Sequence, residues 1–281
     1  MLIARLTVWV VAISVIVTSV VTLGLFVAFE DKAERYTAGR QPTLYYAAVG
    51  DVLLDDYSHV FGVAHNSGDS LSATMRAFQY GADVIEIDVL EYNGVLYAAH
   101  NAPLPRVGGQ VFRGPRLDDA WAMASRAEVV KLDLKQTTPS FTARLIQFLN
   151  AHQEQKTIVT TGDEATLRAI AEGAPHVFRL LSIASAERFA ALQSDEALLA
   201  VIDGVTIQHT LLNAETAAWL NDQSLTILAW TVNDIERVNE LVTLGVDAIT
   251  TDNLAILELL GGFRRDEALL ERAANRRAGV H

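Results

Sequence analysis

The chain has 281 residues, a net charge of −12 and 51% hydrophobic residues, and it contains no cysteine. The absence of cysteine excludes disulfides, zinc–thiolate sites and cysteine nucleophiles. The acidic balance argues against nucleic acid as a partner, because phosphate backbones require a basic surface. A chain of this length suits one large α/β domain, commonly ~250 residues, with a short accessory segment.

An uncharged run extends from Leu6 to Phe29 near the amino terminus. It is longer than the ~20 residues that a helix needs to cross a bilayer. Trp9 and Phe29 lie near its ends, where aromatic residues favour the membrane interface. We therefore expect residues 1–30 to form a membrane anchor with a single transmembrane helix. A cleaved signal peptide is the alternative, although its apolar region usually spans only ~7–15 residues.

Cationic residues flank this run on both sides. Arg5 precedes it, and Lys32, Arg35 and Arg40 follow it. Cation counting alone places the rest of the chain in the cytoplasm. Long domains translocate largely regardless of flanking charge, so these residues leave the side of the membrane open.

Residues 31–57 have the mixed composition of a linker, and residues 58–262 alternate short apolar runs with helical patterns. The expected strands are 60–65, 83–90, 129–135, 157–160, 177–182, 201–208, 225–231 and 247–251. The expected helices are 71–80, 139–153, 164–172, 185–193, 214–221 and 234–244. Residues 263–281 have the composition of a charged tail.

Residues suited to capping helices precede several of these patterns, namely Ser70, Thr138, Asp163, Ser185, Asn213 and Asn233. Strands that alternate with helices predict a parallel sheet, and eight is the number that closes a (β/α)8 TIM barrel. A doubly wound open sheet is the alternative. The number of strands and the polar residues at strand ends favour the barrel.

Ionisable residues gather at the ends of three consecutive strand units. His65 ends the first. Glu86 and Asp88 are two positions apart in the second, and Asp133 and Lys135 are two apart in the third, so each pair shares one face of its strand. Carboxylates on an otherwise apolar strand are costly to bury without a cation. Mg²⁺ and Ca²⁺ bind through such oxygens.

His100 follows the apolar Tyr97-Ala98-Ala99 run and adds a second histidine to this set. A lone histidine is usually structural, and a carboxylate on a strand can be a simple ion-pair partner. Ionisable groups at the ends of consecutive barrel strands together favour an active site over a structural histidine and simple ion pairs.

Five segments, in order along the chain, resemble the glycerophosphodiester phosphodiesterase family: HNSGDSLSATMRAFQYGADVIEIDV, AAHN, VVKLDLK, AWTVND and GVDAITTD. That family belongs to the phospholipase C-like TIM-barrel phosphodiesterases, which include the sphingomyelinase D and phospholipase D toxins. The resemblance spans roughly residues 60–255. It implies a divalent metal ion, Mg²⁺ or Ca²⁺, and a phosphodiester or phospholipid substrate.

The resemblance also implies roles for individual residues. His65 and His100 match the two family histidines that act as the acid–base pair. Glu86, Asp88 and Asp133 match the metal ligands. The position of Asp133 usually holds glutamate in glycerophosphodiesterases and aspartate in the toxin branch.

Three further positions concern the substrate. Lys135 matches a family lysine that adds a second cation, and Trp230 matches a tryptophan that borders the substrate. Asn66 stands where the family usually has an arginine that helps to hold phosphate. A short segment separates His100 from Asp133, where glycerophosphodiesterases often carry a longer insertion; this favours an open site suited to a lipid head group.

These observations predict a metal-dependent phosphodiesterase that hydrolyses glycerophosphodiesters or related phospholipid head groups by histidine acid–base catalysis. Two alternatives stay open: a phospholipase D-like or sphingomyelinase D-like lipid-cleaving enzyme, and a catalytically weakened lipid-binding barrel, which Asn66 keeps in view. Family analogy slightly favours an extracytoplasmic catalytic domain. The sequence leaves open the head group, the ion, the acid and base assignment, and the oligomeric state.

Overall fold

The computed structural model describes residues 44–49, 54, 57, 59–101 and 114–262. The predicted anchor over 1–30 and the predicted tail over 263–281 lie outside these residues. Among the helices that the structure describes, none has the length and apolar character needed to span a bilayer.

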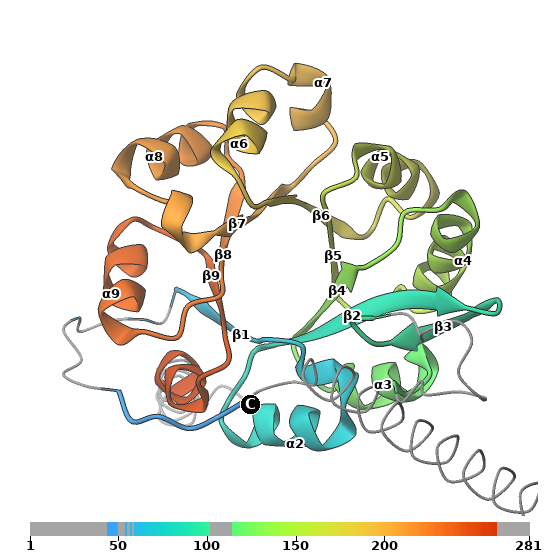
Figure 1. The fold of residues 1–281 in the computed structure, drawn as a ribbon, viewed down its shortest axis with the longest axis horizontal. Coiled ribbons are helices and arrows are strands. Elements are labelled where there is room, and N and C mark those ends of the chain that lie inside the picture. The colour runs from blue at the N-terminus through green and yellow to red at the C-terminus, as the bar shows by residue number, and fades with distance from the viewer. Residues whose placement is uncertain (1–43, 50–53, 55–56, 58, 102–113, 263–281) are drawn as a thin grey trace, which may run out of the picture. The chain divides into compact units, whose positions relative to one another are not determined.

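Eight parallel strands form a closed ring, which confirms the TIM barrel and rules out the open sheet (Figure 1). They are β1 (Phe61–Ala64), β2 (Val84–Tyr92), β4 (Val129–Leu134), β5 (Thr157–Thr161), β6 (Phe178–Ile183), β7 (Gly204–Gln208), β8 (Thr226–Trp230) and β9 (Ala248–Thr251). Strand β1 pairs with both β9 and β2, which closes the ring. Each expected strand overlaps one of these.

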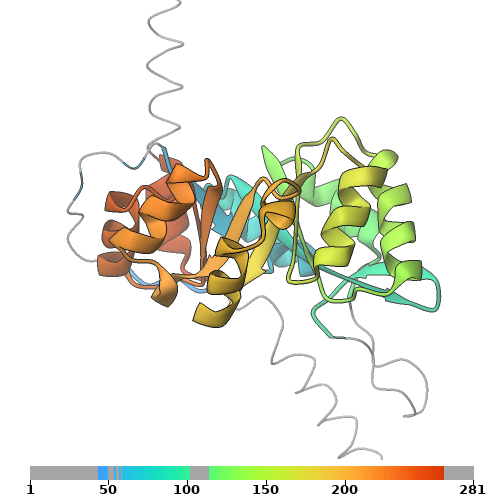
Figure 2. The same cartoon turned by 90° about the horizontal axis from the view of Figure 1, so that it is seen from above.

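The helices lie outside the ring of strands (Figures 1 and 2). They are α2 (Leu71–Gln79), α3 (Leu117–Ala124), α4 (Pro139–Asn150), α5 (Glu164–Gly173), α6 (Ala186–Gln193), α7 (Glu196–Leu199), α8 (Ala214–Asp222) and α9 (Ile235–Thr243), with a further helix over 254–262. Two short 3₁₀ helices, η1 (Ser67–Asp69) and η2 (His209–Leu211), follow β1 and β7. All six expected helices are present.

Most of the predicted helix caps are confirmed. The side chains that accept a first-turn backbone N–H are Thr138, Asp163, Ser185 and Asn213. Ser70 occupies the N-cap position of α2 without such a bond. The prediction for Asn233 was wrong, because the next residue, Asp234, caps α9.

A β-hairpin that the sequence analysis missed follows β2. Strand β3 (Val95–Ala98) pairs antiparallel with β2 and lies beside it outside the ring (Figure 1). The turn contains Asn93 and Gly94, with φ of 50° and 77°, and Asn-Gly is a strong signal for such a turn. After β3, Ala99 N donates a 2.8 Å hydrogen bond to Asp88 O. The hairpin therefore returns the chain to Asp88.

The barrel interior is apolar at one level and polar at the next. An inner cluster contains Val63, Val84, Leu180, Leu228 and Ala248. Alternate residues of a strand share a face, and further along the inward-facing positions the buried residues include Glu86, Lys131, Thr160, Thr206 and Thr250. The carboxyl ends of the strands thus carry the ionisable groups, which is where TIM barrels hold their active sites.

Candidate active site

The structure places the predicted site residues at the carboxyl ends of the barrel strands. Glu86 and Asp88 lie in β2, Asp133 lies in β4, and Trp230 ends β8. The other four follow strands: His65 and Asn66 follow β1, Lys135 follows β4, and His100 follows β3, the antiparallel strand beside β2.

Three carboxylates from neighbouring strands converge. Glu86, Asp88 and Asp133 each offer an oxygen, and these oxygens lie within 4.8 Å of one another. The register explains the convergence, because Asp88 in β2 pairs directly with Asp133 in β4. Glu86 and Asp88 are both buried. This is the cluster that the sequence pattern predicted.

The free oxygens of this cluster fit a divalent cation. Glu86 Oε2 and Asp88 Oδ2 are buried and have no hydrogen-bond partner in the structure. Burial raises the pKa of Asp88 to about 7; Lys135 opposes this rise, and Asp133 and Glu86 add to it. Buried oxygens of this kind are stabilised by an oxygen-binding ion such as Mg²⁺ or Ca²⁺.

Two lysines lie against the same carboxylates. Lys135 Nζ is 3.0 Å from Asp88 Oδ1 and also pairs with Asp133. Burial lowers the pKa of Lys135, but the charges of Asp88 and Asp133 outweigh burial and raise it overall. Lys131, which the sequence analysis missed, is buried and pairs with Glu86 Oε1. Its position two residues before Asp133 was the available signal, because alternate residues share a face.

The two lysines also act on Asp133. Burial raises the pKa of this carboxyl, whereas Lys131 and Lys135 lower it, and the net pKa lies below its usual value. Thr160 Oγ1 donates a further hydrogen bond of 2.7 Å to Asp133 Oδ1. Asp133 is therefore held in its charged form.

His65, which follows β1, is held by a hydrogen-bond network of residues that follow the neighbouring strands β8 and β9. Its Nδ1 lies 2.8 Å from Asp252 Oδ1. Asn233 Nδ2 donates to Asp252 Oδ2 at 3.0 Å, and Asn233 Oδ1 accepts from Asp252 N at 2.8 Å. Burial lowers the pKa of His65, but the bond to Asp252 and the charge of Glu86 raise it more. Asp252 was not among the predicted site residues, although its place just after β9 was an available signal.

The turn after His65 is fixed against β2. Asp69 Oδ1 accepts a 2.8 Å hydrogen bond from Asp88 N. Gly68 packs so closely that an added Cβ would lie 2.3 Å from Ile87 Cγ1. Burial raises the pKa of Asp69 well above its usual value, and the charge of Asp88 adds to this. Asn66 begins the turn with a left-handed φ of 49°. The histidine strand and the carboxylate strand are thus joined through this turn.

The two remaining predicted residues have polar ring atoms near the carboxyl ends of their strands. His100 Nδ1 lies 3.2 Å from Asn101 Oδ1. Trp230 Nε1 is buried and has no hydrogen-bond partner in the structure. The roles of these side chains stay predictions.

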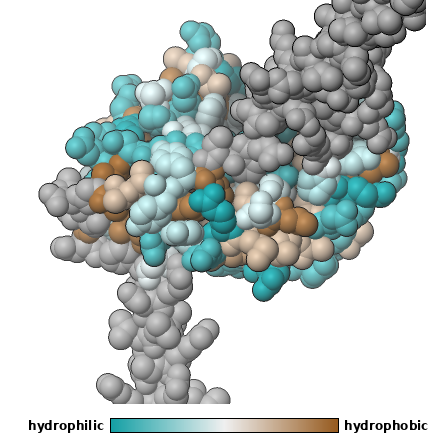
Figure 3. Space-filling view, turned by 60° about the horizontal axis from the view of Figure 1, so that its bottom comes forward, coloured by the Kyte–Doolittle hydropathy of each residue, from teal (hydrophilic) through white to brown (hydrophobic). Residues whose placement is uncertain are grey.

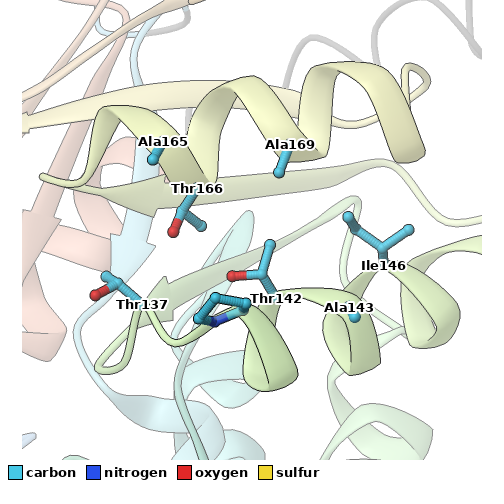
Figure 4. A pocket seen from close by; sticks show the side chains of 8 residues that line it. Thr137, Thr142, Ala143, Ile146, Ala165, Thr166 and Ala169 are labelled. Atoms are coloured by element: carbon cyan, nitrogen blue, oxygen red, sulfur yellow. The ribbon is translucent and has the colours of Figure 1, made fainter.

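A groove separate from this cluster lies between α4 and α5 (Figure 4). Its volume is about 260 Å³. The side chains that line it are Thr137, Pro139, Thr142, Ala143, Ile146, Ala165, Thr166 and Ala169. None of them is ionisable, so the groove offers no acid, base or metal ligand.

Comparison with known proteins agrees with this geometry. A model of the glycerophosphoryl diester phosphodiesterase family matches residues 110–256. This range contains Asp133, Lys135, Trp230 and Asp252 and begins after His100. A glycerophosphodiester phosphodiesterase of Arabidopsis thaliana, GDPD4, is 25% identical over 249 residues, which cover 74% of this chain and 76% of that protein.

Solved structures share the fold. A phosphodiesterase of Oleispira antarctica, solved with the product sn-glycerol-3-phosphate, has a TM-score of 0.59 at 19% identity and covers 72% of this chain and 96% of its own. A glycerophosphodiester phosphodiesterase of Agrobacterium tumefaciens has a TM-score of 0.55 at 23% identity, with coverages of 73% and 99%. Since the family model matches more than half of the 281 residues, the chain belongs to the glycerophosphoryl diester phosphodiesterase family and is a hydrolase that acts on phosphodiesters.

Proposed function

We propose that this protein hydrolyses glycerophosphodiesters with the help of a divalent cation held by Glu86, Asp88 and Asp133. The observation that carries this proposal is the convergence of these three carboxylates, with buried unpartnered oxygens, at the catalytic end of the barrel. The Oleispira antarctica relative was solved with sn-glycerol-3-phosphate, which supports a glycerol phosphate as one product here.

The mechanism assigns proton transfer to the histidines. When His65 Nδ1–H donates to Asp252 Oδ1, Nε2 is left to face the substrate, and the raised pKa of His65 favours its protonated form. His65 then suits the general acid, which protonates the leaving oxygen as the P–O bond breaks. His100 would accept the proton of the attacking hydroxyl or water.

Two kinds of positive charge support the developing negative charge on phosphate. A cation held by Glu86, Asp88 and Asp133 would supply Lewis-acid stabilisation of this charge. Lys135, already beside Asp88 and Asp133, would offer its remaining N–H donors to the same phosphate. Asn66 would border the phosphate without adding charge, and Trp230 would border the organic group.

The proposal is tested with glycerophosphocholine and the variants His65→Ala and His100→Ala. Each variant should lose about 10²-fold or more in kcat, and a chelator should abolish cleavage by the wild type. His176→Ala removes an exposed histidine and should leave the rate unchanged. Cleavage that resists chelator and survives both active-site substitutions would contradict the proposal.

A second candidate function, cleavage of lipid head groups at a membrane surface, is favoured by an apolar flank. Four of the five exposed large hydrophobic residues in the described part of the chain lie in segment 44–49 or on α2: Tyr45, Tyr46, Leu71 and Met75. Segment 44–49 contacts the end of α2, since the ring of Tyr46 lies 5.7 Å from that of Tyr80, the residue that follows the helix. Figure 3 brings the α2 side of the barrel forward and shows apolar patches on it.

The chemistry of this flank suits a zwitterionic lipid surface. Residues 44–49 and 71–79 contain no carboxylate, although the net charge of the chain is −12. Leu71 follows Asp69 closely, so the flank reaches the catalytic end. Residues 1–43 precede this flank in the sequence and include the uncharged run expected to anchor the chain. Anchoring through that run, with an extracytoplasmic catalytic domain, is part of this second proposal.

The two candidate functions differ in how they depend on the flank. The double variant Leu71→Ser and Met75→Ser in the full chain should slow cleavage of lysophosphatidylcholine in phosphatidylcholine vesicles. It should leave cleavage of soluble glycerophosphocholine unchanged. Phe178→Ser, which alters the fifth exposed apolar residue, is the control. Equal rates on vesicles for the wild type and the double variant would contradict the lipid-surface proposal.

A further inference from the structure

None of the three cluster carboxylates has both oxygens free of protein donors. Glu86 Oε1 pairs with Lys131. Asp133 Oδ1 accepts from Thr160 at 2.7 Å, and Asp133 Oδ2 pairs with Lys135. Asp88 Oδ1 lies 3.0 Å from Lys135. Glu86 Oε2 and Asp88 Oδ2 are therefore free for a metal ion, whereas Asp133 can offer either oxygen, and Glu86 and Asp88 a second one, only at the expense of an existing contact.

This matters because ions differ in the ligands that they use. Ca²⁺ takes ~6–8 oxygens and commonly binds a carboxylate through both oxygens, whereas Mg²⁺ requires octahedral geometry, uses single oxygens and keeps several waters. A site of three carboxylates that each bind through one oxygen suits Mg²⁺ better than Ca²⁺.

Of these contacts, the ion pair between Lys131 and Glu86 is the most costly to break. Lys131 is only 3% exposed, and the backbone register places Glu86 and Lys131 directly opposite on β2 and β4. Separating this pair would leave two buried charges without compensation, which is strongly unfavourable. Glu86 Oε2 is then the only oxygen of this side chain left for an ion.

We propose that Lys131 restricts Glu86 to one ligand oxygen and, with Thr160 acting on Asp133 in the same way, biases the metal site toward Mg²⁺ and against Ca²⁺. This inference rests on the proposed function, since it concerns the cation of that site. It assigns Lys131 and Thr160 as positioning residues, because neither is required to touch the ion.

The test measures ion binding directly, by calorimetric titration of the metal-free full chain with Mg²⁺ and with Ca²⁺. In Lys131→Met both ions should bind more tightly, because a nearby positive charge is lost. Ca²⁺ should gain more, so that the Ca²⁺-to-Mg²⁺ ratio of Kd values falls by about tenfold. Lys156→Met, which removes an exposed lysine, should leave both Kd values unchanged.

Thr160→Val separates the number of ligand oxygens from charge. It frees Asp133 Oδ1 without changing net charge, and it should lower the same ratio by roughly threefold. Thr206→Val removes a buried barrel hydroxyl that has no hydrogen-bond partner in the structure and should leave the ratio unchanged. Thermal unfolding of each variant shows whether it is folded. If Lys131→Met does not fold, the result with Thr160→Val tests the inference by itself.

The outcomes are distinguishable. Ratios equal to that of the wild type in the folded variants would overturn the inference while leaving the proposed metal-dependent function in place. A wild-type chain that binds neither ion would overturn the proposed function and the inference together. A lowered ratio in Thr160→Val with an unchanged ratio in Thr206→Val would support the inference.

Discussion

His65 and Asp252 are joined by a 2.8 Å contact between Nδ1 and Oδ1, across the seam where β1 meets β9. Asp252 is itself held by two contacts with Asn233. A carboxylate that accepts from Nδ1–H fixes the tautomer and the orientation of an imidazole. Asp252 is thus a positioning residue for His65.

Replacing Asp252 with asparagine should lower both the activity and the pKa of His65. The bond to Asp252 raises that pKa against the opposing effect of burial, so its loss should shift the corresponding limb of the pH–rate profile to lower pH. We expect kcat to fall by about 10²-fold, as for loss of a positioned acid or base. NMR titration of the His65 ring gives the pKa independently.

The same substitution should change how stability depends on pH. A histidine with a raised folded-state pKa contributes stability that is fully present below its unfolded value, near 6.5, and is lost as pH rises through the folded value. The wild type should exceed Asp252→Asn in free energy of unfolding most clearly below pH 6.5. Asp222→Asn, at an exposed helix end, is the control. An unchanged His65 titration in Asp252→Asn would show that Asp252 does not act on His65.

Asp88→Asn should stabilise the metal-free protein while it removes metal binding. Asp88 Oδ2 is a buried carboxylate oxygen with no hydrogen-bond partner in the structure, and burial penalises the charged form. We expect a gain on the order of 2 kcal/mol at pH 8 without added metal, seen as a higher Tm. With saturating Mg²⁺ the order should reverse, because only the wild type gains binding energy.

Asp118→Asn is the matched control for this prediction, because Asp118 is largely exposed and its Tm should not respond to metal. A metal-free Asp88→Asn protein that is less stable than the wild type would mean that the charged form of Asp88 is not penalised in the fold.

The sequence predicted the barrel and most of the site because both follow local rules. Two-residue spacing puts Glu86 and Asp88 on one face of their strand, and Asp133 and Lys135 on one face of theirs, independently of the other strands. Eight strands alternating with helices then close the ring. The roles of these residues as ligands and catalysts stay predictions.

The parts that the sequence did not predict depend on contacts between distant segments. The bond between His65 and Asp252 joins residues 187 positions apart, so no local pattern shows it. Lys131 shares the parity of Asp133, but only the register of β2 and β4 pairs it with Glu86. Asn233 was predicted to cap α9, but its side chain hydrogen-bonds to Asp252. Asp234 is the residue that caps the helix. The β3 hairpin, by contrast, has a local signal, the Asn93-Gly94 turn.

Gly68→Ala should disturb both halves of the site, because Gly68 is where the turn after His65 touches β2. An added Cβ would lie 2.3 Å from Ile87 Cγ1 and 3.0 Å from Glu86 O, so the turn must move away from the strand. Overpacking of this kind typically costs about 1–3 kcal/mol. We expect a lower Tm, weaker metal binding and a lower kcat.

Gly262→Ala is the control for this substitution, since an added Cβ there meets nothing within 4 Å. Wild-type stability and kcat in Gly68→Ala would show that the turn is not fixed against β2.

Gly94→Val tests whether the β2–β3 hairpin delivers His100 to the site. Gly94 has a φ of +77°, where a β-branched residue costs about 1–2 kcal/mol. The strain falls on the turn that returns the chain to Asp88, through the bond from Ala99 N to Asp88 O. The variant should therefore show a lower kcat, with Mg²⁺ affinity near that of the wild type, because the three carboxylates lie in β2 and β4.

Gly245→Val separates this effect from simple loss of stability. Gly245 has a comparable φ of +79° but precedes β9, at the end of the strand away from the site. Both variants should lose similar stability in thermal unfolding, and only Gly94→Val should lose activity when assayed well below its Tm. Equal kcat losses in the two variants would mean that stability, rather than the position of His100, accounts for the effect. Since a catalytic histidine must lie within hydrogen-bond reach of the group that it protonates or deprotonates, a small displacement of the hairpin is enough to slow the reaction.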